Sequence, residues 1–350
     1  MRAYLREGPL AVAPTTSGRT GCPPAPPAQP VPSARPANRT SPTLPSHPAP
    51  AYPEHLRDAV ERYLESLRFS SGTRGPAGTE SAGLEEAMRY SLLAGGKRIR
   101  PVLALATASA IGRDPEWVLP LGAAIELIHT YSLIHDDLPA MDDDDLRRGR
   151  PTCHRAFGED VAILAGDGLY AEAFVLLLSA QEAPAARLLD AARRLALATG
   201  ADGMVAGQYV DVAGTAPPGP AGLRRLHELK TGRLIAASVE CVLLLAGLED
   251  AERIDSFESF ARELGVLFQI VDDILDVTGS EETLGKHQGS DERLGRRTYV
   301  TEFGVDGARE LASKSHARAR EALAHAGAPG QPGVTAELEQ ITDFIATRSF

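Results

Sequence analysis

Apolar side chains recur every three or four residues through most of the chain after Pro53, the spacing that places them on one face of an α-helix. The pattern predicts helices over residues 56–67, 84–93, 101–111, 116–135, 161–179, 184–199, 223–245 and 254–277. No alternating pattern with hairpin turns indicates a β-sheet. The predicted fold class is therefore all-α, with long and mostly buried helices in one domain over residues 53–350.

Residues 1–52 have a different composition, rich in Pro, Ala, Ser and Thr and without apolar periodicity. Such a segment cannot bury a hydrophobic face, so it is predicted to be a disordered tail. Organelle transit peptides share its arginine content and its lack of acid, since Glu7 is the only carboxylate. The high proline content favours an ordinary disordered extension over a transit peptide. We therefore expect a cytoplasmic protein, with an organelle as the alternative.

Composition limits the classes of partner. The formal net charge of -11 argues against nucleic acid. No uninterrupted apolar run reaches the roughly 18 residues that a membrane span needs, so no span is expected. Cys22, Cys153 and Cys241 are too far apart in the sequence to suggest a zinc site or a disulfide framework, and they fit a reducing compartment.

Six carboxylates fall within the ten residues from Asp136 to Asp145, directly after an apolar run and before Arg147 and Arg148. Carboxylates this close repel one another unless a cation lies among them. Oxygen ligands without a nearby Cys select a hard metal, and Mg²⁺ is the usual one where phosphate oxygens complete the coordination. The two arginines would add forked donors for the same phosphate.

A second acidic cluster, Asp272-Asp273-Ile274-Leu275-Asp276, lies inside the apolar run from Val266 to Val277. Asp272 and Asp276 are four residues apart, so they share one face of a helix. A solvated acidic turn is the plain alternative for an acidic run. Two acidic clusters within apolar helices are hard to tolerate without shared cations, which favours a metal site.

Three cations crowd the glycine turn Gly95-Gly96-Lys97-Arg98-Ile99-Arg100-Pro101. The glycines allow a tight turn, and Pro101 suits the first turn of the next helix, whose exposed N–H groups attract anions. The stretch resembles an anion site, with a solvated basic turn as the alternative. Lys230-Thr231-Gly232-Arg233, within an apolar helical pattern, is a weaker candidate.

His129 lies seven residues, or two helical turns, before Asp136 and therefore on the same face. It also ends a Glu126-x-x-His129 pair of the kind found in carboxylate-bridged metal bundles. Such bundles need two pairs, and the sequence contains no second one. A structural histidine is the plain alternative, while the position beneath the acidic cluster favours substrate contact.

Taken in order, these motifs resemble the trans-isoprenyl diphosphate synthases, the family of farnesyl and geranylgeranyl diphosphate synthases. The stretches that carry the resemblance are Gly95 to Pro101, His129 to Asp137, Met141 to Pro151, Lys230 to Gly232, Phe268 to Asp276, Gly285-Lys286 and Leu294-Gly295. The resemblance covers the chain from about Pro53 onward and leaves the proline-rich tail unmatched.

The resemblance implies a single large helical bundle around a deep central apolar cavity. It also implies a homodimeric enzyme that joins isopentenyl diphosphate head to tail to an allylic diphosphate. By the same resemblance the enzyme depends on three Mg²⁺ ions, for which Mn²⁺ could substitute. The residues implied to bind the metal ions or their bound waters are Asp136, Asp137, Asp142, Asp272, Asp273 and Asp276. The implied diphosphate-binding residues are Arg147 and Lys286 on the allylic side, and Lys97, Arg100, His129 and Arg148 on the isopentenyl side. Lys230, Thr231 and Gln269 would line the allylic site and stabilise the cation.

Product length is expected to depend on Tyr131, which precedes Asp136 by five residues, or roughly 7.5 Å along a helix axis. A ring there would form the floor of an apolar pocket, beside the small Ser132. In the family an aromatic residue at this position accompanies the farnesyl product, so farnesyl diphosphate is predicted and geranylgeranyl diphosphate is the alternative. The plain alternative is a tyrosine that only packs between helices.

The chain departs from the family pattern at Gly295-Arg296-Arg297, where many members carry Gly-Lys. A cation is kept, with a different geometry. A class I terpene cyclase would lack the Gly95–Pro101 anion site, and its second metal motif would carry Asn and Ser or Thr. A non-catalytic subunit of a prenyl synthase would usually have lost one acidic motif, and both are intact here.

Overall fold

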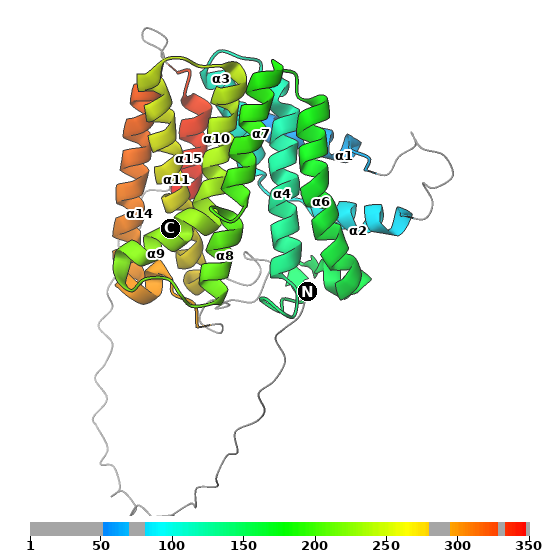
Figure 1. Cartoon of the computed structure of the whole chain (residues 1–350). Helices are drawn as coiled ribbons and strands as arrows, with labels where there is room; N and C mark the ends of the chain where they lie inside the picture. The colour runs from blue at the N-terminus through cyan, green and yellow to red at the C-terminus, as the bar shows by residue number, and fades with distance from the viewer. Residues whose placement is uncertain (1–51, 70–80, 280–294, 328–332, 348–350) are drawn as a thin grey trace, which may run out of the picture. The chain divides into compact units, whose positions relative to one another are not determined.

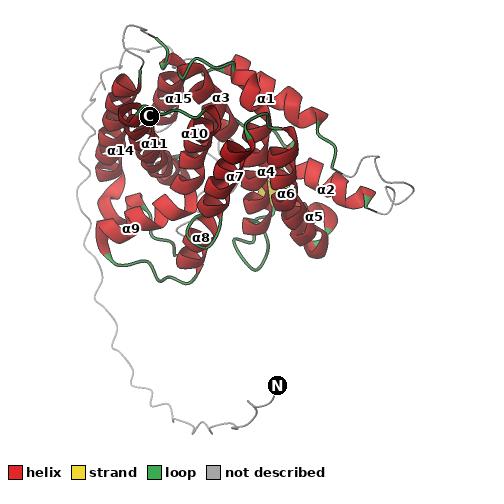
Figure 2. Cartoon of the chain, turned by 45° about the horizontal axis from the view of Figure 1, so that its top comes forward, coloured by secondary structure: helices red, strands yellow, loops and turns green. Residues whose placement is uncertain are grey.

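The computed structural model describes residues 52–69, 81–279, 295–327 and 333–347, which belong to one compact unit of the chain. Its helices are α1 (Glu54–Ser66), α2 (Ala82–Leu92), α3 (Ile99–Ala110), the 3₁₀ helix η2 (Pro115–Val118), α4 (Leu119–Asp136), α5 (Cys153–Phe157), α6 (Glu159–Ala180), α7 (Ala185–Thr199), α8 (Met204–Val212), α9 (Gly219–His227), the π-helix η3 (Glu228–Gly232), α10 (Arg233–Ala246), α11 (Ala251–Thr278), α14 (Tyr299–Ala326) and α15 (Ala336–Thr347). The all-α prediction is confirmed (Figure 2).

Long helices lie side by side around a core of aliphatic and aromatic side chains. In Figure 1, α4 runs beside α6, and α11 runs beside α14. Helix α3, which is buried along almost its whole length, packs against α4 and α10. This packing places the end of α4 and the second half of α11, which carry the two acidic clusters, within one bundle.

Local sequence explains where the elements that carry the site begin. Pro120 lies in the first turn of α4, where its missing N–H costs nothing. The Asp250 side chain accepts a hydrogen bond from the Arg253 N–H and so caps α11. At the start of α14, Thr298 and Thr301 form a reciprocal capping box.

The predicted helix over residues 223–245 is in fact three elements, because the π-helix η3 separates α9 from α10. The apolar pattern also gave no range for α8, α14 or α15. A two-residue antiparallel ladder joins β1 (Leu146–Arg147) to β2 (Arg150–Pro151), where no hairpin was predicted. The predicted tail over residues 1–52 lies outside the described residues except for Tyr52.

Among the described residues, Pro115–Asp136 and Glu159–Ala180 are long and apolar enough to cross a membrane by length and composition alone. Scattered polar residues interrupt both segments, so neither is an uninterrupted apolar run. In the first, 67% of the apolar window is buried in the bundle, as in a core helix of a soluble protein. In the second, α6, 33% is buried, so most of this apolar window is exposed in the part of the chain that the structure describes.

Candidate active site

The first acidic cluster begins at the C-terminus of α4. Asp136 is the last residue of the helix, and its carbonyl accepts a hydrogen bond from the Asp142 N–H at 2.9 Å. The loop between them therefore folds back and brings the two aspartates to the same turn. Burial raises the pKa of Asp136 to about 6, which Lys230 opposes and the nearby Asp142 carboxylate reinforces. A carboxylate in this environment is stabilised by an added cation.

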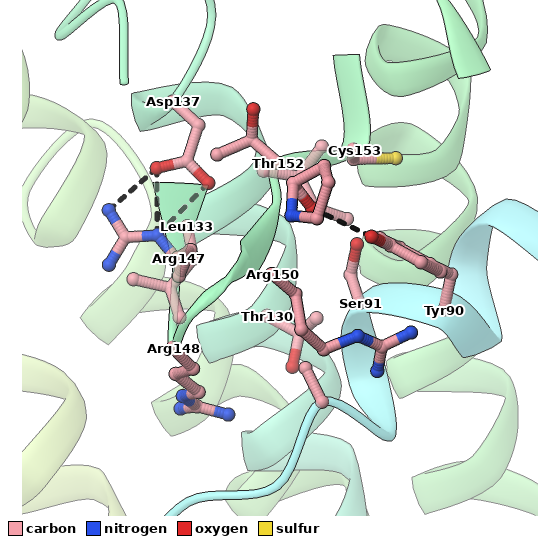
Figure 3. A pocket seen from close by; sticks show the side chains of 13 residues that line it. Tyr90, Ser91, Thr130, Leu133, Asp137, Arg147, Arg148, Arg150, Thr152 and Cys153 are labelled. Carbon is pink, nitrogen blue, oxygen red and sulfur yellow. Dashed lines mark hydrogen bonds and ion pairs between the residues drawn. The ribbon is translucent and has the colours of Figure 1, made fainter. Parts of the chain in front are cut away.

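Asp137 has a fixed partner. Arg147 Nε lies 2.7 and 2.9 Å from its two oxygens, and Arg147 Nη2 lies 2.6 Å from Oδ1. Figure 3 shows this forked pair on the wall of a pocket between α2, the end of α4 and the β1–β2 hairpin. Tyr90 closes another side of the pocket, because its hydroxyl donates to the Pro151 carbonyl at 2.8 Å (Figure 3). Asp137 and Arg147 thus hold the hairpin against α4.

Asp142 is paired with Arg296, whose guanidinium donates to both of its carboxylate oxygens. Arg296 Nε also lies 3.6 Å from Asp211 Oδ2, and Lys230 Nζ lies 2.6 Å from the same oxygen. Arg296 and Lys230 thus neutralise Asp142 and Asp211. Within residues 52–69, 81–279, 295–327 and 333–347, no group of three or more Asp, Glu, His or Cys side chains is assembled for a metal ion.

Of the three cations in the glycine turn, Arg98 is structural. Its guanidinium is fully buried and forms ion pairs with Glu61 at 2.8 Å and with Glu126 at 2.7 Å, and it donates to the Leu92 carbonyl at 2.7 Å. Glu126, which the sequence pairs with His129 as a metal-bundle motif, is therefore the partner of Arg98. This network holds the turn onto α1 and α4.

The remaining cations are available to a ligand. Lys97 Nζ lies 5.1 Å from the ring centre of Phe344 and has no carboxylate partner within the described chain. Burial lowers the pKa of Arg100 to about 10, and Glu126 and Asp272 counteract the effect. Arg100 thus keeps its charge at neutral pH and lies near the second acidic cluster. Burial, and then the guanidinium of Arg100, lowers the pKa of His129 well below its usual value, so its imidazole is neutral.

Arg148 is held against the glycine turn, where its guanidinium donates to the Gly95 carbonyl. A Cβ at Gly96, whose φ is 128°, would lie 2.8 Å from the Arg148 guanidinium carbon. Glycine at this position therefore serves both the backbone conformation and the close approach of the arginine. The arrangement gathers Lys97, Arg100, His129 and Arg148, the predicted isopentenyl diphosphate residues, near the start of α3.

The π-helix η3 carries the predicted allylic-site residues Lys230 and Thr231. Short π-helical turns occur frequently at functional sites, because they redirect side chains within a longer helix. Gly207 of α8 makes room for this turn, since a Cβ there would lie 2.3 Å from the Lys230 nitrogen. Thr231 Oγ1 donates to Gln269 Oε1 at 2.9 Å, which joins η3 to the turn of α11 just before Asp272.

The second cluster keeps its predicted helical spacing, since α11 runs without interruption through it. Asp272 is exposed, whereas Asp273 and Asp276 are buried. Asp273 accepts hydrogen bonds from Gln269 Nε2 at 2.8 Å and from the Tyr299 N–H at 2.7 Å. Only Asp272 of the three therefore presents an exposed carboxylate. Lys286 lies outside the described residues.

Tyr131 packs against α6. Its ring centre lies 5.1 Å from that of Tyr170, which in turn lies 5.4 Å from Phe174. Ser132 donates to the carbonyl of His129 at 2.8 Å. The predicted pocket floor is therefore part of a row of three aromatic rings between α4 and α6.

Asp211, Arg296 and Tyr299 belong to this site and were not predicted to do so. Asp211 is the only charged residue of the apolar helix α8, an unusual position that could have marked it. Arg296 stood out in the sequence only as a departure from the family pattern. Tyr299 contributes a backbone N–H, which no residue pattern reveals.

Comparison with known proteins identifies the family. Residues 81–326 match the profile of the family described as Polyprenyl synthetase. The chain is 45% identical to a farnesyl diphosphate synthase of Geobacillus stearothermophilus, over 84% of this chain and 94% of that one. It is also 45% identical to a chloroplastic geranylgeranyl pyrophosphate synthase of Catharanthus roseus, over 76% and 74%.

A solved structure has the same fold. The geranyltransferase of Helicobacter pylori, crystallised with magnesium and isoprenyl diphosphate, superposes with a TM-score of 0.73 at 31% identity, over 85% of this chain and 97% of that one. The predicted resemblance is therefore confirmed, and the chain belongs to the polyprenyl synthetase family and is a trans-prenyltransferase.

Proposed function

We propose that this enzyme makes farnesyl diphosphate by head-to-tail condensation of isopentenyl diphosphate with dimethylallyl and then geranyl diphosphate. The observation that carries the proposal is the position of η3. Lys230 pairs with Asp211, which Arg296 links to Asp142 of the first acidic cluster. The next residue, Thr231, donates a hydrogen bond to Gln269 beside the second cluster. Two acidic clusters 136 residues apart in sequence thus lie around one short turn.

Mg²⁺ fits the residues that would hold it. The donors are carboxylate oxygens, which suit a hard cation, and burial together with Asp142 raises the pKa of Asp136. We propose Asp136, Asp142 and Asp272 as direct ligands of three ions, with Mn²⁺ as a substitute. When bound, the metal would neutralise the diphosphate that leaves the allylic carbon. Arg296 pairs with Asp142, and Lys230, which pairs with Asp211, also supplies positive charge to Asp136.

The cations of the site divide between two diphosphates. Lys97, Arg100 and Arg148 would bind isopentenyl diphosphate, and the neutral His129 would donate one hydrogen bond to it. Arg147 and Lys286 would bind the allylic diphosphate, where the forked guanidinium matches phosphate oxygens. The net charge of -11 repels anions at long range, so these local cations are needed to attract both substrates.

Tyr131→Ala is expected to lengthen the product from fifteen to twenty carbons or more, because removing the ring deepens the apolar pocket. The Tyr131 ring contacts that of Tyr170, which contacts that of Phe174. We propose that Tyr170 forms the next barrier, so Tyr131→Ala with Tyr170→Ala should lengthen the product further. Chromatography of the dephosphorylated products measures the length. Products of unchanged length from Tyr131→Ala would mean that the ring only packs between helices.

We further propose a homodimer that buries the outer face of α6. Ile163, Leu164, Val175 and Leu178 on this helix are each at least 45% exposed, which is an extensive apolar surface for a single chain. Sedimentation at working concentration is expected to give a dimer, and Leu164→Glu with Val175→Glu to give a monomer. A monomeric wild-type protein would contradict the assignment.

The intact second acidic cluster favours an elongating enzyme over a terpene cyclase or a non-catalytic subunit. Geranylgeranyl diphosphate is the alternative product, supported by the Catharanthus roseus relative. We propose that the enzyme is cytoplasmic. An organelle is the alternative, because the Catharanthus roseus relative is named chloroplastic.

One assay tests the function. The protein is incubated with Mg²⁺, isopentenyl diphosphate and, in separate reactions, dimethylallyl, geranyl or farnesyl diphosphate, and the dephosphorylated products are chromatographed. We expect farnesol from the first two primers and little elongation of the third. Efficient elongation of farnesyl diphosphate would favour the geranylgeranyl alternative, and no elongation with any primer would remove the enzyme assignment.

A further inference from the structure

A chain of hydrogen bonds leads from Thr231 to a buried carboxylate. The Thr231 hydroxyl donates to Gln269 Oε1 at 2.9 Å, and Gln269 Nε2 donates to Asp273 Oδ1 at 2.8 Å. The other oxygen of Asp273 accepts the Tyr299 N–H at 2.7 Å. Asp273 is only 1% exposed and its bond from the Tyr299 N–H is buried, while the two bonds through Gln269 are partly buried. The electrostatic effect of a hydrogen bond is larger where water is excluded.

The direction of each bond follows from chemistry. An ionised carboxylate only accepts hydrogen bonds, so the amide nitrogen of Gln269 faces Asp273 and its oxygen faces Thr231. The hydroxyl hydrogen of Thr231 then points at Gln269, which leaves the lone pairs of its oxygen directed elsewhere. A negative charge at the end of such a chain polarises each bond and increases the electron density on the Thr231 oxygen.

Tyr299 fixes the other end of the chain. Its ring is buried and stacks on His227 with ring centres 5.3 Å apart and an angle of 26° between the planes. His227 is the last residue of α9 and directly precedes η3, which carries Thr231. The contacts therefore form a closed circuit through α9, η3, α11 and the start of α14. Both carboxylate oxygens of Asp273 accept hydrogen bonds within this circuit.

We propose that Asp273 is a positioning residue for the allylic cation rather than a metal ligand. Resting on the proposed function, its charge acts through Gln269 and keeps the Thr231 oxygen electron-rich towards the carbon that becomes positive. That carbon loses its bond to the diphosphate oxygen, which keeps the electron pair. The double bond of isopentenyl diphosphate then forms the new carbon–carbon bond, and the released diphosphate takes the proton. No proton is transferred to Asp273 in these steps.

Asp273→Asn tests the proposal, because an amide cannot accept from both Gln269 and Tyr299. Gln269 must then turn over, and the Thr231 hydrogen rotates towards the substrate. We expect kcat to fall about 10- to 100-fold, the range for loss of one charge-assisted hydrogen bond, with little change in either KM. Binding of Mn²⁺ with inorganic diphosphate, measured by calorimetry, should stay as in the wild type, whereas Asp272→Asn should weaken it.

A matched double variant separates this role from a structural one. Combining Asp273→Asn with Gln269→Glu exchanges the amide and the carboxylate. The glutamate then accepts from Thr231 and from the asparagine amide, and the asparagine oxygen accepts from Tyr299. Every bond of the chain regains a partner, so the double variant should recover most of the lost kcat. Gln269→Glu alone places two carboxylates in contact and should be less active than the double variant.

Three results would overturn the proposal: an unchanged kcat in Asp273→Asn, a loss of Mn²⁺ affinity as large as that of Asp272→Asn, or no recovery in the double variant. If Asp273→Asn does not fold, Gln269→Leu decides the matter, because it breaks the chain and leaves the bond from Tyr299 to Asp273. An unchanged kcat in Gln269→Leu contradicts the proposal. Absence of elongation by the wild-type protein would instead contradict the proposed function.

Discussion

Asp136→Ala is expected to lower turnover by about a thousandfold or more, and Asp272→Ala by a similar factor, because each removes a charge that holds the cations on the leaving diphosphate. Neither Asp136 nor Asp272 caps its helix or belongs to the buried face of that helix. Folding should therefore be preserved. Turnover with saturating substrates, together with thermal unfolding of each variant, measures the two effects separately.

Asp145→Asn is the matched control for these variants. Asp145 belongs to the same acidic run, but its side chain is 59% exposed and pairs with the exposed Arg155 at 2.9 Å. Its replacement should leave turnover within about twofold of wild type, as expected for an exposed surface pair. Near-normal turnover in Asp136→Ala would show that its metal role is wrong, and a large loss in the control would show that the whole run acts together.

Arg98→Met is expected to lower the free energy of unfolding by about 3–5 kcal/mol, the cost of leaving buried charges without their partner. Glu126 is 2% exposed and depends on the Arg98 guanidinium for its ion pair, and Glu61 shares the same guanidinium. Urea unfolding followed by circular dichroism measures the change.

Two further variants test the cause of that loss. Arg57→Met removes two surface ion pairs, with Glu54 and Asp58, and should cost less than about 1 kcal/mol. Adding Glu61→Gln and Glu126→Leu to Arg98→Met should restore much of the lost stability, because a buried charge network can often be replaced by apolar groups of similar volume. An Arg98→Met variant as stable as wild type would mean that the turn does not depend on this network.

Helical periodicity and the acidic clusters could be predicted because they are properties of adjacent residues. Helices α4 and α11 match their predicted ranges closely, and both clusters lie at the predicted ends of apolar helices. The glycine turn was also correctly placed between α2 and α3, since the two glycines and Pro101 act locally on the backbone.

The sequence could not separate Arg98 from its neighbours in the glycine turn. Lys97, Arg98 and Arg100 are equivalent by composition, and only folding brings Glu61, from 37 residues upstream, to the middle one. The π-helix η3 could not be predicted from the sequence for a similar reason. Gly207 and Gly265 let α8 and α11 approach it closely, and such contacts leave no periodic pattern around residue 230.

The hydrogen bonds and ion pairs of Asp273 and Asp142 could not be predicted from the sequence either. A sequence motif groups Asp272, Asp273 and Asp276 as one kind of ligand, whereas burial and the Tyr299 N–H distinguish Asp273 from Asp272. Arg296 reaches Asp142 across 154 residues, so its role depends on tertiary structure alone.

A crystal structure with Mg²⁺ and an unreactive thio analogue of dimethylallyl diphosphate tests the central claim most directly. We predict that the diphosphate lies between Asp136 and Asp142 on one side and Asp272 on the other, joined to them through metal ions, with its hydrocarbon end directed along α4 towards Tyr131. A diphosphate bound away from either aspartate cluster, or metal ions bound at only one of the two clusters, would contradict the account.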